Sequence, residues 1–182
     1  MRKASTDDGG PRPGAVGVAE PRARYPAESR SVPHDAAGRP ARALLDVNVL
    51  IALLDADHLH HPRASAWLAE NLAAGWASCA VTQNGCVRIM SQPGYPGSLP
   101  AARVAERLRD ATSTAHHLFV DETPSLLDGE RFDTEQLLGH RQVTDAWLLG
   151  LAVAHQLRFV TFDAQVSMRV VRGARPQDLV VL

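Results

Sequence analysis

The sequence predicts an α/β domain with a largely parallel sheet. Two observations lead to this prediction. From Ala43 onward, short apolar runs alternate with segments whose apolar side chains recur at helical spacing. This alternation is typical of parallel sheets, because a parallel strand pair needs a long crossover connection. The chain has 182 residues, enough for one domain with a full core but too few for two comfortable ones.

The first strand and helix are predicted in ALLDVNVLIALL, residues 43–54. ALLDV is short and apolar, as a buried strand is, and NVLIALL begins a helix. Residues 60–74 form a second helix, in which apolar side chains follow helical spacing. WASCAV, residues 76–81, is a second apolar strand, and QNGCVRIMS, residues 83–91, forms the next helix.

A link rich in glycine and proline, residues 92–100, follows this helix. Residues 101–112 then form an amphipathic helix, and HHLFV, residues 116–120, a third strand. A loop with a short helix covers residues 126–143. Three elements complete the domain: the strongly apolar helix TDAWLLGLAVAHQL, the strand RFVTF and the C-terminal strand LVVL.

Residues 1–42 differ in composition from the rest of the chain. They hold six of the 12 prolines and five of the 13 glycines, and they show no apolar periodicity. We therefore predict a disordered N-terminal extension over residues 1–42 and a folded domain over residues 43–182. The extension carries eight basic and five acidic residues, and the domain 11 and 15, which together give the net charge of −1. This balance excludes a globally basic nucleic-acid binder.

Composition also predicts the compartment. No apolar stretch approaches the roughly 20 residues that a membrane span requires, and the N-terminus lacks the hydrophobic region of a signal peptide. The only cysteines, Cys79 and Cys86, lie in a moderately apolar segment, which favours two buried thiols over a disulfide. We expect a cytoplasmic protein with no membrane association.

Three aspartates each adjoin an apolar core segment. Asp46 ends the first strand and Asp163 the fourth, while Asp145 opens the long helix after Thr144, a predicted N-cap. Strand carboxyl ends and helix N-termini meet at one edge of a parallel sheet, where the three carboxylates would repel one another unless a cation lay between them. Oxygen ligands favour Mg²⁺ or Mn²⁺. Taken singly, each aspartate is also explained as a turn or first-turn residue, so the prediction depends on the three together.

Other phosphate chemistries fail on residue counts. Lys3 is the only lysine, and Asn48 stands where a haloacid-dehalogenase-type phosphatase needs the second aspartate of Asp-x-Asp. Such phosphatases and receiver domains both need a lysine near the phosphate, and the chain has no P-loop motif. It has neither a CxxC nor an HExxH zinc motif. The histidines of DADHLHHPRA, residues 55–64, are predicted to form a solvated surface rather than a metal site.

Three segments resemble the PIN-domain family, specifically the VapC-type toxins of bacterial toxin–antitoxin pairs. They are LLDVNVLIALLDADHLHHPRA, TQNGCVRIMSQP and GHRQVTDAWLLGLAVAHQLRFVTFD, in order and at family-like spacing. The resemblance runs from about Ala43 to the C-terminus, and its third segment is the most specific. It implies a PIN-like three-layer sandwich, with a largely parallel sheet and helices on both faces. It also implies an endoribonuclease that uses Mg²⁺, or Mn²⁺ as a substitute, to hydrolyse RNA phosphodiester bonds. A tRNA or a ribosomal RNA loop would be the target.

The resemblance also implies two protein partners and a set of site residues. A cognate antitoxin would cover the acidic cleft, and the usual unit would be a homodimer. Carried over by position, Asp46, Asp145 and Asp163 are the catalytic residues, with Asp46 and Asp145 as metal ligands. The residues expected to align the carboxylates or water are Asn48, Gln83, Thr144 and Thr161. Those expected to contact RNA phosphates, although surface arginines are common, are Arg88, His140 and Arg141.

The chain departs from the family at one acid. Gln83 stands where the family often has glutamate, and its amide oxygen accepts a hydrogen bond but brings no charge. We therefore expect a one-metal site with weakened cation affinity, because Mg²⁺ is commonly held by one or two protein carboxylates plus other oxygens. Asp133 or Glu135 could replace the missing charge. The alternative hypothesis is a catalytically silent PIN-domain protein that only binds RNA or its antitoxin.

Overall fold

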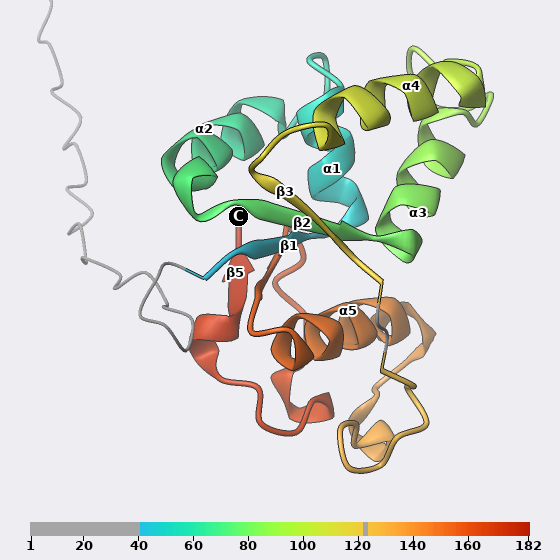
Figure 1. Ribbon diagram of the computed structural model, residues 1–182. Coiled ribbons are helices and arrows are strands. Elements are labelled where there is room, and N and C mark those ends of the chain that lie inside the picture. The colour runs from blue at the N-terminus through green and yellow to red at the C-terminus, as the bar shows by residue number, and fades with distance from the viewer. Residues whose placement is uncertain (1–40, 122–123) are drawn as a thin grey trace, which may run out of the picture. The chain divides into compact units, whose positions relative to one another are not determined.

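Five parallel strands form one sheet in the computed structural model, which describes residues 41–121 and 124–182 (Figure 1). The strands are β1 (Ala43–Leu45), β2 (Trp76–Cys79), β3 (His117–Val120), β4 (Arg158–Thr161) and β5 (Leu179–Val181). Their order is β3-β2-β1-β4-β5, so β1 is central, with Leu44 paired to Ala77 on one side and Phe159 on the other. The predicted parallel sheet is confirmed.

Helices cover both faces of this sheet. The α-helices are α1 (Val47–Leu54), α2 (His61–Asn71), α3 (Ala80–Met90), α4 (Ala101–Thr112) and α5 (Val143–Ala154). The short 3₁₀ helices are η1 (Leu72–Ala74), η2 (Thr134–Gln136), η3 (His140–Gln142), η4 (Met168–Val170) and η5 (Pro176–Asp178). Figure 1 shows α1 to α4 on one side of the strands and α5 on the other, as the predicted three-layer sandwich requires. Across the described residues, no helix is both long and apolar enough to span a membrane.

Two apolar cores result, one on each face of the sheet. Successive strand side chains point to opposite faces, so Leu44 joins the core under α5 while Leu45 joins the core under α1 and α3. Both are fully buried. Cys79 and Cys86 are free and buried, one in each core, as predicted.

Three element boundaries differ from the prediction. The first strand ends at Leu45, because the Asp46 carboxylate accepts the Val47 N–H and caps α1. The second strand ends at Cys79, since α3 already begins at Ala80. The predicted N-cap Thr144 is wrong: η3 runs directly into α5, which begins at Val143 with Gln142 at the N-cap position.

Residues 1–40, to which most of the predicted disordered extension belongs, lie outside the described residues. Ala41, which the prediction also placed in the extension, is 5% exposed and packs with the domain. Its carbonyl oxygen accepts a hydrogen bond from Nε of the buried Arg158 at 3.0 Å. Arg158 Nη2 also donates to Asn71 Oδ1 at 3.1 Å, so this arginine joins the start of β4 to the end of α2.

Gly85 brings α3 close to the start of α1. A Cβ at Gly85 would lie 2.8 Å from Cγ2 of Val47, the residue that follows Asp46. We expect Gly85→Ala to lower the free energy of unfolding by about 1–3 kcal/mol, because the helices must separate to admit the methyl group. Urea denaturation measures this loss. Gly94→Ala is the control, because a Cβ there meets no atom within 4 Å, and an equal loss in both variants would contradict the packing argument.

Candidate active site

The central strand β1 is the topological switch point of the sheet, where the strand order reverses. From β1 the chain adds β2 and β3 on one side, and later β4 and β5 on the other. Ligands of open parallel sheets bind at such a point, outside the carboxyl ends of the strands. Asp46 directly follows β1, and Asp163 stands two residues after β4, the neighbouring strand. Strand pairing therefore brings residues 117 positions apart to the same edge.

Asp46 is held rigidly at this edge. It is 5% exposed, and its Oδ1 accepts the Val47 N–H at 2.6 Å. Its Oδ2 accepts a hydrogen bond from Thr161 Oγ1 at 3.0 Å. Burial raises the pKa of Asp46 above its ordinary value of 3.8, against the opposing effect of the hydrogen bonds from Thr161, Val47 and Asn48. The charge of Asp163 raises it further.

Asp145 reaches the same region from the first turn of α5. Burial, followed by the charges of Asp46 and Asp163, raises the pKa of Asp145 to about 6. The three carboxylates therefore lie within electrostatic range of one another, and we call them the aspartate cluster. Within the described ranges, no arginine, lysine or histidine forms an ion pair with any of the three. Among the residues that the structure describes, the cluster thus carries negative charge that no ion pair compensates.

Thr161 connects two members of the aspartate cluster. Its hydroxyl donates to Asp46 and accepts the backbone N–H of Asp163 at 3.1 Å. Asp163 is exposed, and its Oδ1 accepts the Gln165 N–H at 2.7 Å. The side chain of Thr161 is fully buried, so it fixes the relative position of the residues that follow β1 and β4.

The donor chemistry of the cluster fits a hard divalent cation. Across residues 41–121 and 124–182, no group of three or more His, Cys, Asp or Glu side chains is placed to hold a metal ion together. Mg²⁺ does not need one, because one or two carboxylates with waters and substrate phosphates suffice. Asp46 and Asp145 are the two carboxylates whose ionisation burial opposes most, and a cation between them would favour that ionisation.

The predicted supporting residues divide into two groups. Asn48 is exposed and hydrogen-bonds to Asp46, and Thr161 links the cluster as described. Thr144 is exposed in the first turn of α5, and the structure gives it no hydrogen bond to the cluster. Gln83 Nε2 instead donates to Ser78 Oγ at 2.9 Å, and that hydroxyl lies 2.8 Å from His117 Nε2. The amide of Gln83 is therefore held toward β2 and β3.

The structure also shows the positions of the other charged residues that the sequence proposed for the site. Asp133, a candidate to replace the missing acid, pairs with Arg172 Nη2 at 3.7 Å, and Glu135 is exposed in η2. Neither contributes to the pKa shifts of Asp46 and Asp145. The candidates for RNA contact are all exposed, and they are Arg88, His140 and Arg141.

The histidines between α1 and α2 do not form the solvated surface that the sequence predicted. His58, His60 and His61 are each only partly exposed. The His61 ring nitrogen Nδ1 lies 2.8 Å from Ala52 O, and the His60 ring packs on Phe162 with centroids 4.5 Å apart. The turn folds over the end of β4, which removes these rings from full solvent contact.

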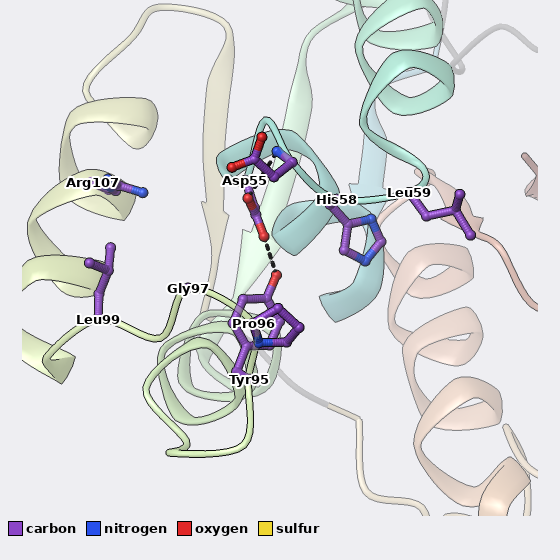
Figure 2. A pocket seen from close by; sticks show the side chains of 9 residues that line it. Asp55, His58, Leu59, Tyr95, Pro96, Gly97, Leu99 and Arg107 are labelled. Atoms are coloured by element: carbon purple, nitrogen blue, oxygen red, sulfur yellow. Dashed lines mark hydrogen bonds between the residues drawn. The ribbon is translucent and has the colours of Figure 1, made fainter.

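A pocket of about 520 Å³ lies at the other end of α1 (Figure 2). Asp55, the C-cap of α1, accepts a hydrogen bond from Tyr95 O–H at 2.5 Å, and Arg107 of α4 also lines the pocket. The eight residues of α1, about 12 Å of helix, separate this pocket from Asp46. The aspartate cluster is therefore distinct from the pocket.

The fold and the acidic edge together define a class of protein. The family model described as "PIN domain" matches residues 43–172, and the chain belongs to the PIN-domain family. Among its relatives, Ribonuclease VapC44 of Mycobacterium tuberculosis is 52% identical over 141 residues, which cover 78% of this chain and 99% of that protein. Ribonuclease VapC38 of the same organism is 38% identical over 142 residues, 77% of this chain and 99% of that protein. The VapC-type resemblance is confirmed.

A solved structure also aligns with the chain. It is described as the crystal structure of Mycobacterium tuberculosis VapC20, a Sarcin-Ricin loop cleaving toxin. The TM-score is 0.49 at 15% sequence identity, with 74% of this chain and 99% of the other covered.

Proposed function

We propose that the chain is a divalent-metal-dependent endoribonuclease, the toxin of a toxin–antitoxin pair, that hydrolyses RNA phosphodiester bonds. The aspartate cluster carries this proposal: three coupled carboxylates, without a cationic partner among the described residues, at the ligand-binding edge of a PIN domain. The relatives named as VapC ribonucleases, matched over 99% of their length, support the same activity.

In this proposal Asp46 and Asp145 hold Mg²⁺, for which Mn²⁺ could substitute. When bound, the cation polarises the scissile phosphate and lowers the pKa of the attacking water. Asp163 orients that water, because its Oδ2 makes no hydrogen bond with the described residues while its Oδ1 is held by Gln165. Thr161 and Asn48 keep the Asp46 carboxylate in one orientation.

The negative charge of the cluster also supports a protein partner. We propose a cognate antitoxin that covers the site with an arginine, since a guanidinium binds carboxylates in a forked, charge-assisted geometry. A homodimer and a tRNA or ribosomal RNA loop as substrate complete the proposal. Both come from the family resemblance.

One observation favours the alternative, a catalytically silent protein that binds only RNA or its antitoxin. Gln83 brings no charge, and its amide is engaged by Ser78. The three retained aspartates weigh against this alternative, because a domain released from catalytic demand would be expected to lose more than one of the acids that raise the pKa of Asp145.

The test is RNA cleavage by antitoxin-free protein in a titration of Mg²⁺ or Mn²⁺, with total tRNA and ribosomal RNA as substrates. We expect cleavage that depends on the cation and stops in EDTA. Gln83→Glu is run beside the wild type. Cleavage by Gln83→Glu alone would favour the silent alternative, and no cleavage by either folded protein would refute the nuclease proposal.

A further inference from the structure

We propose that Gln142 is a positioning residue that fixes Asp163 relative to Asp145 and thereby sets the cation affinity of the aspartate cluster. This inference rests on the proposed function, which assigns a divalent cation to the cluster. Nothing in the sequence motifs points to Gln142. Its role follows from hydrogen bonds between segments that are far apart in the chain.

Gln142 occupies the N-cap position of α5, three residues before Asp145. Its side chain bridges two segments, because Oε1 accepts the Leu138 N–H at 3.1 Å and Nε2 donates to Gln165 O at 3.4 Å. One amide therefore joins the loop before α5 to the turn after β4. The first segment leads into the helix that carries Asp145, and the second follows Asp163.

The turn after β4 connects Gln142 to Asp163 through two hydrogen bonds of Gln165. Gln165, whose carbonyl Gln142 holds, donates its own N–H to Asp163 Oδ1 at 2.7 Å. The backbone N–H of Asp163 is held from the other side by Thr161 Oγ1. Since Asp163 is exposed, packing alone does not select its rotamer; the hydrogen bond from Gln165 restrains the carboxylate and the one to Thr161 fixes the backbone.

Two bridges thus connect the three acids. Thr161 joins Asp46 to Asp163, and Gln142 joins the turn of Asp163 to the helix of Asp145. The charge of Asp163 acts on both proposed ligands, Asp46 and Asp145, so a residue that holds Asp163 in place affects metal affinity although neither residue touches the metal. The amide of glutamine is suited to the task because it donates and accepts at once.

The test compares Gln142→Met and Gln142→Glu in the full chain. Methionine keeps the length of the side chain and loses both hydrogen bonds, while glutamate keeps an acceptor for the Leu138 N–H only. We expect Gln142→Met to raise the Mn²⁺ dissociation constant about 3–10-fold, below the 10–100-fold typical of groups that contact a ligand directly. Isothermal titration calorimetry measures this constant without RNA. Gln136→Met, an exposed glutamine in η2, is the matched control and should change nothing.

A double-mutant cycle separates positioning from a general structural effect. In an Asp163→Ala background, Gln142→Met should no longer change the Mn²⁺ dissociation constant, because the carboxylate it positions is gone. An equal loss of affinity in both backgrounds would overturn the proposal, as would an unchanged affinity in Gln142→Met. Wild-type protein that binds Mn²⁺ but cleaves no RNA would refute the proposed function and leave the cycle to decide on Gln142. Wild-type protein that binds no Mn²⁺ would overturn both.

Discussion

Asp145→Asn is expected to abolish RNA cleavage and, at the same time, to stabilise the metal-free protein. Cleavage should fall more than about 100-fold, because the change removes a proposed metal ligand and not merely a group that supports one. Stability should rise because burial and the charges of Asp46 and Asp163 oppose the ionisation of Asp145 and raise its pKa to about 6. Asparagine has a similar shape and no charge to bury.

The size of the stabilisation follows from that pKa. The rise from 3.8 to about 6 corresponds to roughly 3 kcal/mol at neutral pH, and solvent screening of this half-buried group reduces it to about 1–2 kcal/mol. For a domain of this size, the melting temperature should increase by about 2–6 °C. Thermal unfolding in EDTA measures the increase, and RNA cleavage with Mg²⁺ measures the loss.

Asp57→Asn is the matched control, since it removes one exposed carboxylate beyond the far end of α1. Neither its cleavage nor its melting temperature should change. Asp46→Asn should also stop cleavage, and its amide oxygen can still cap α1 at Val47. Cleavage by Asp145→Asn at the wild-type rate would remove this residue from the catalytic set.

The second expected result is a metal-free protein that loses stability as the pH rises from 5 to 7.5. Asp145 has a folded-state pKa of about 6, above its ordinary value of 3.8. Its contribution to stability is therefore complete below about 3.8 and is lost as the pH rises through about 6. Urea denaturation in EDTA across this range measures the loss.

Comparison with Asp145→Asn isolates the effect of this one group. His117 acts in the opposite direction, because burial lowers its pKa and its neutral form stabilises the protein at higher pH. The difference in unfolding free energy between wild type and Asp145→Asn cancels that background, and it should grow between pH 5 and 7.5. Saturating Mg²⁺ should remove or reverse the loss in the wild type, since the cation binds the ionised carboxylate. A pH-independent difference would contradict the assignment of the raised pKa to Asp145.

The local sequence pattern was sufficient to predict the strands and helices of the fold and the three members of the aspartate cluster. Apolar runs located all five strands. The strands β1, β2 and β4 are buried, which requires continuous apolar sequence, and the edge strands β3 and β5 are apolar although partly exposed. Helical spacing located the helices between them. The aspartate cluster was predictable for the same reason. Polar residues that directly follow buried strands must lie at the carboxyl edge of the sheet.

Side-chain contacts between residues far apart in the chain were not predictable. The family resemblance led us to expect an acid at the position of Gln83, whose amide instead donates to Ser78. The histidines after α1 are partly buried by contacts with Phe162 and Ala52. Gln142 has no sequence signal, because its partners Leu138 and Gln165 are brought together only when the loop before α5 meets the turn after β4.

The sequence by itself determined the order of strands and helices along the chain, the family to which the chain belongs and the identity of the three aspartates. These depend on local periodicity and on residue type. Only the tertiary structure decided which side chains hold those aspartates in place. The hydrogen bond from Thr161 to Asp46 joins residues 115 positions apart, and it exists because β1 and β4 pair side by side. Side-chain partners follow from such pairing, which local sequence does not encode.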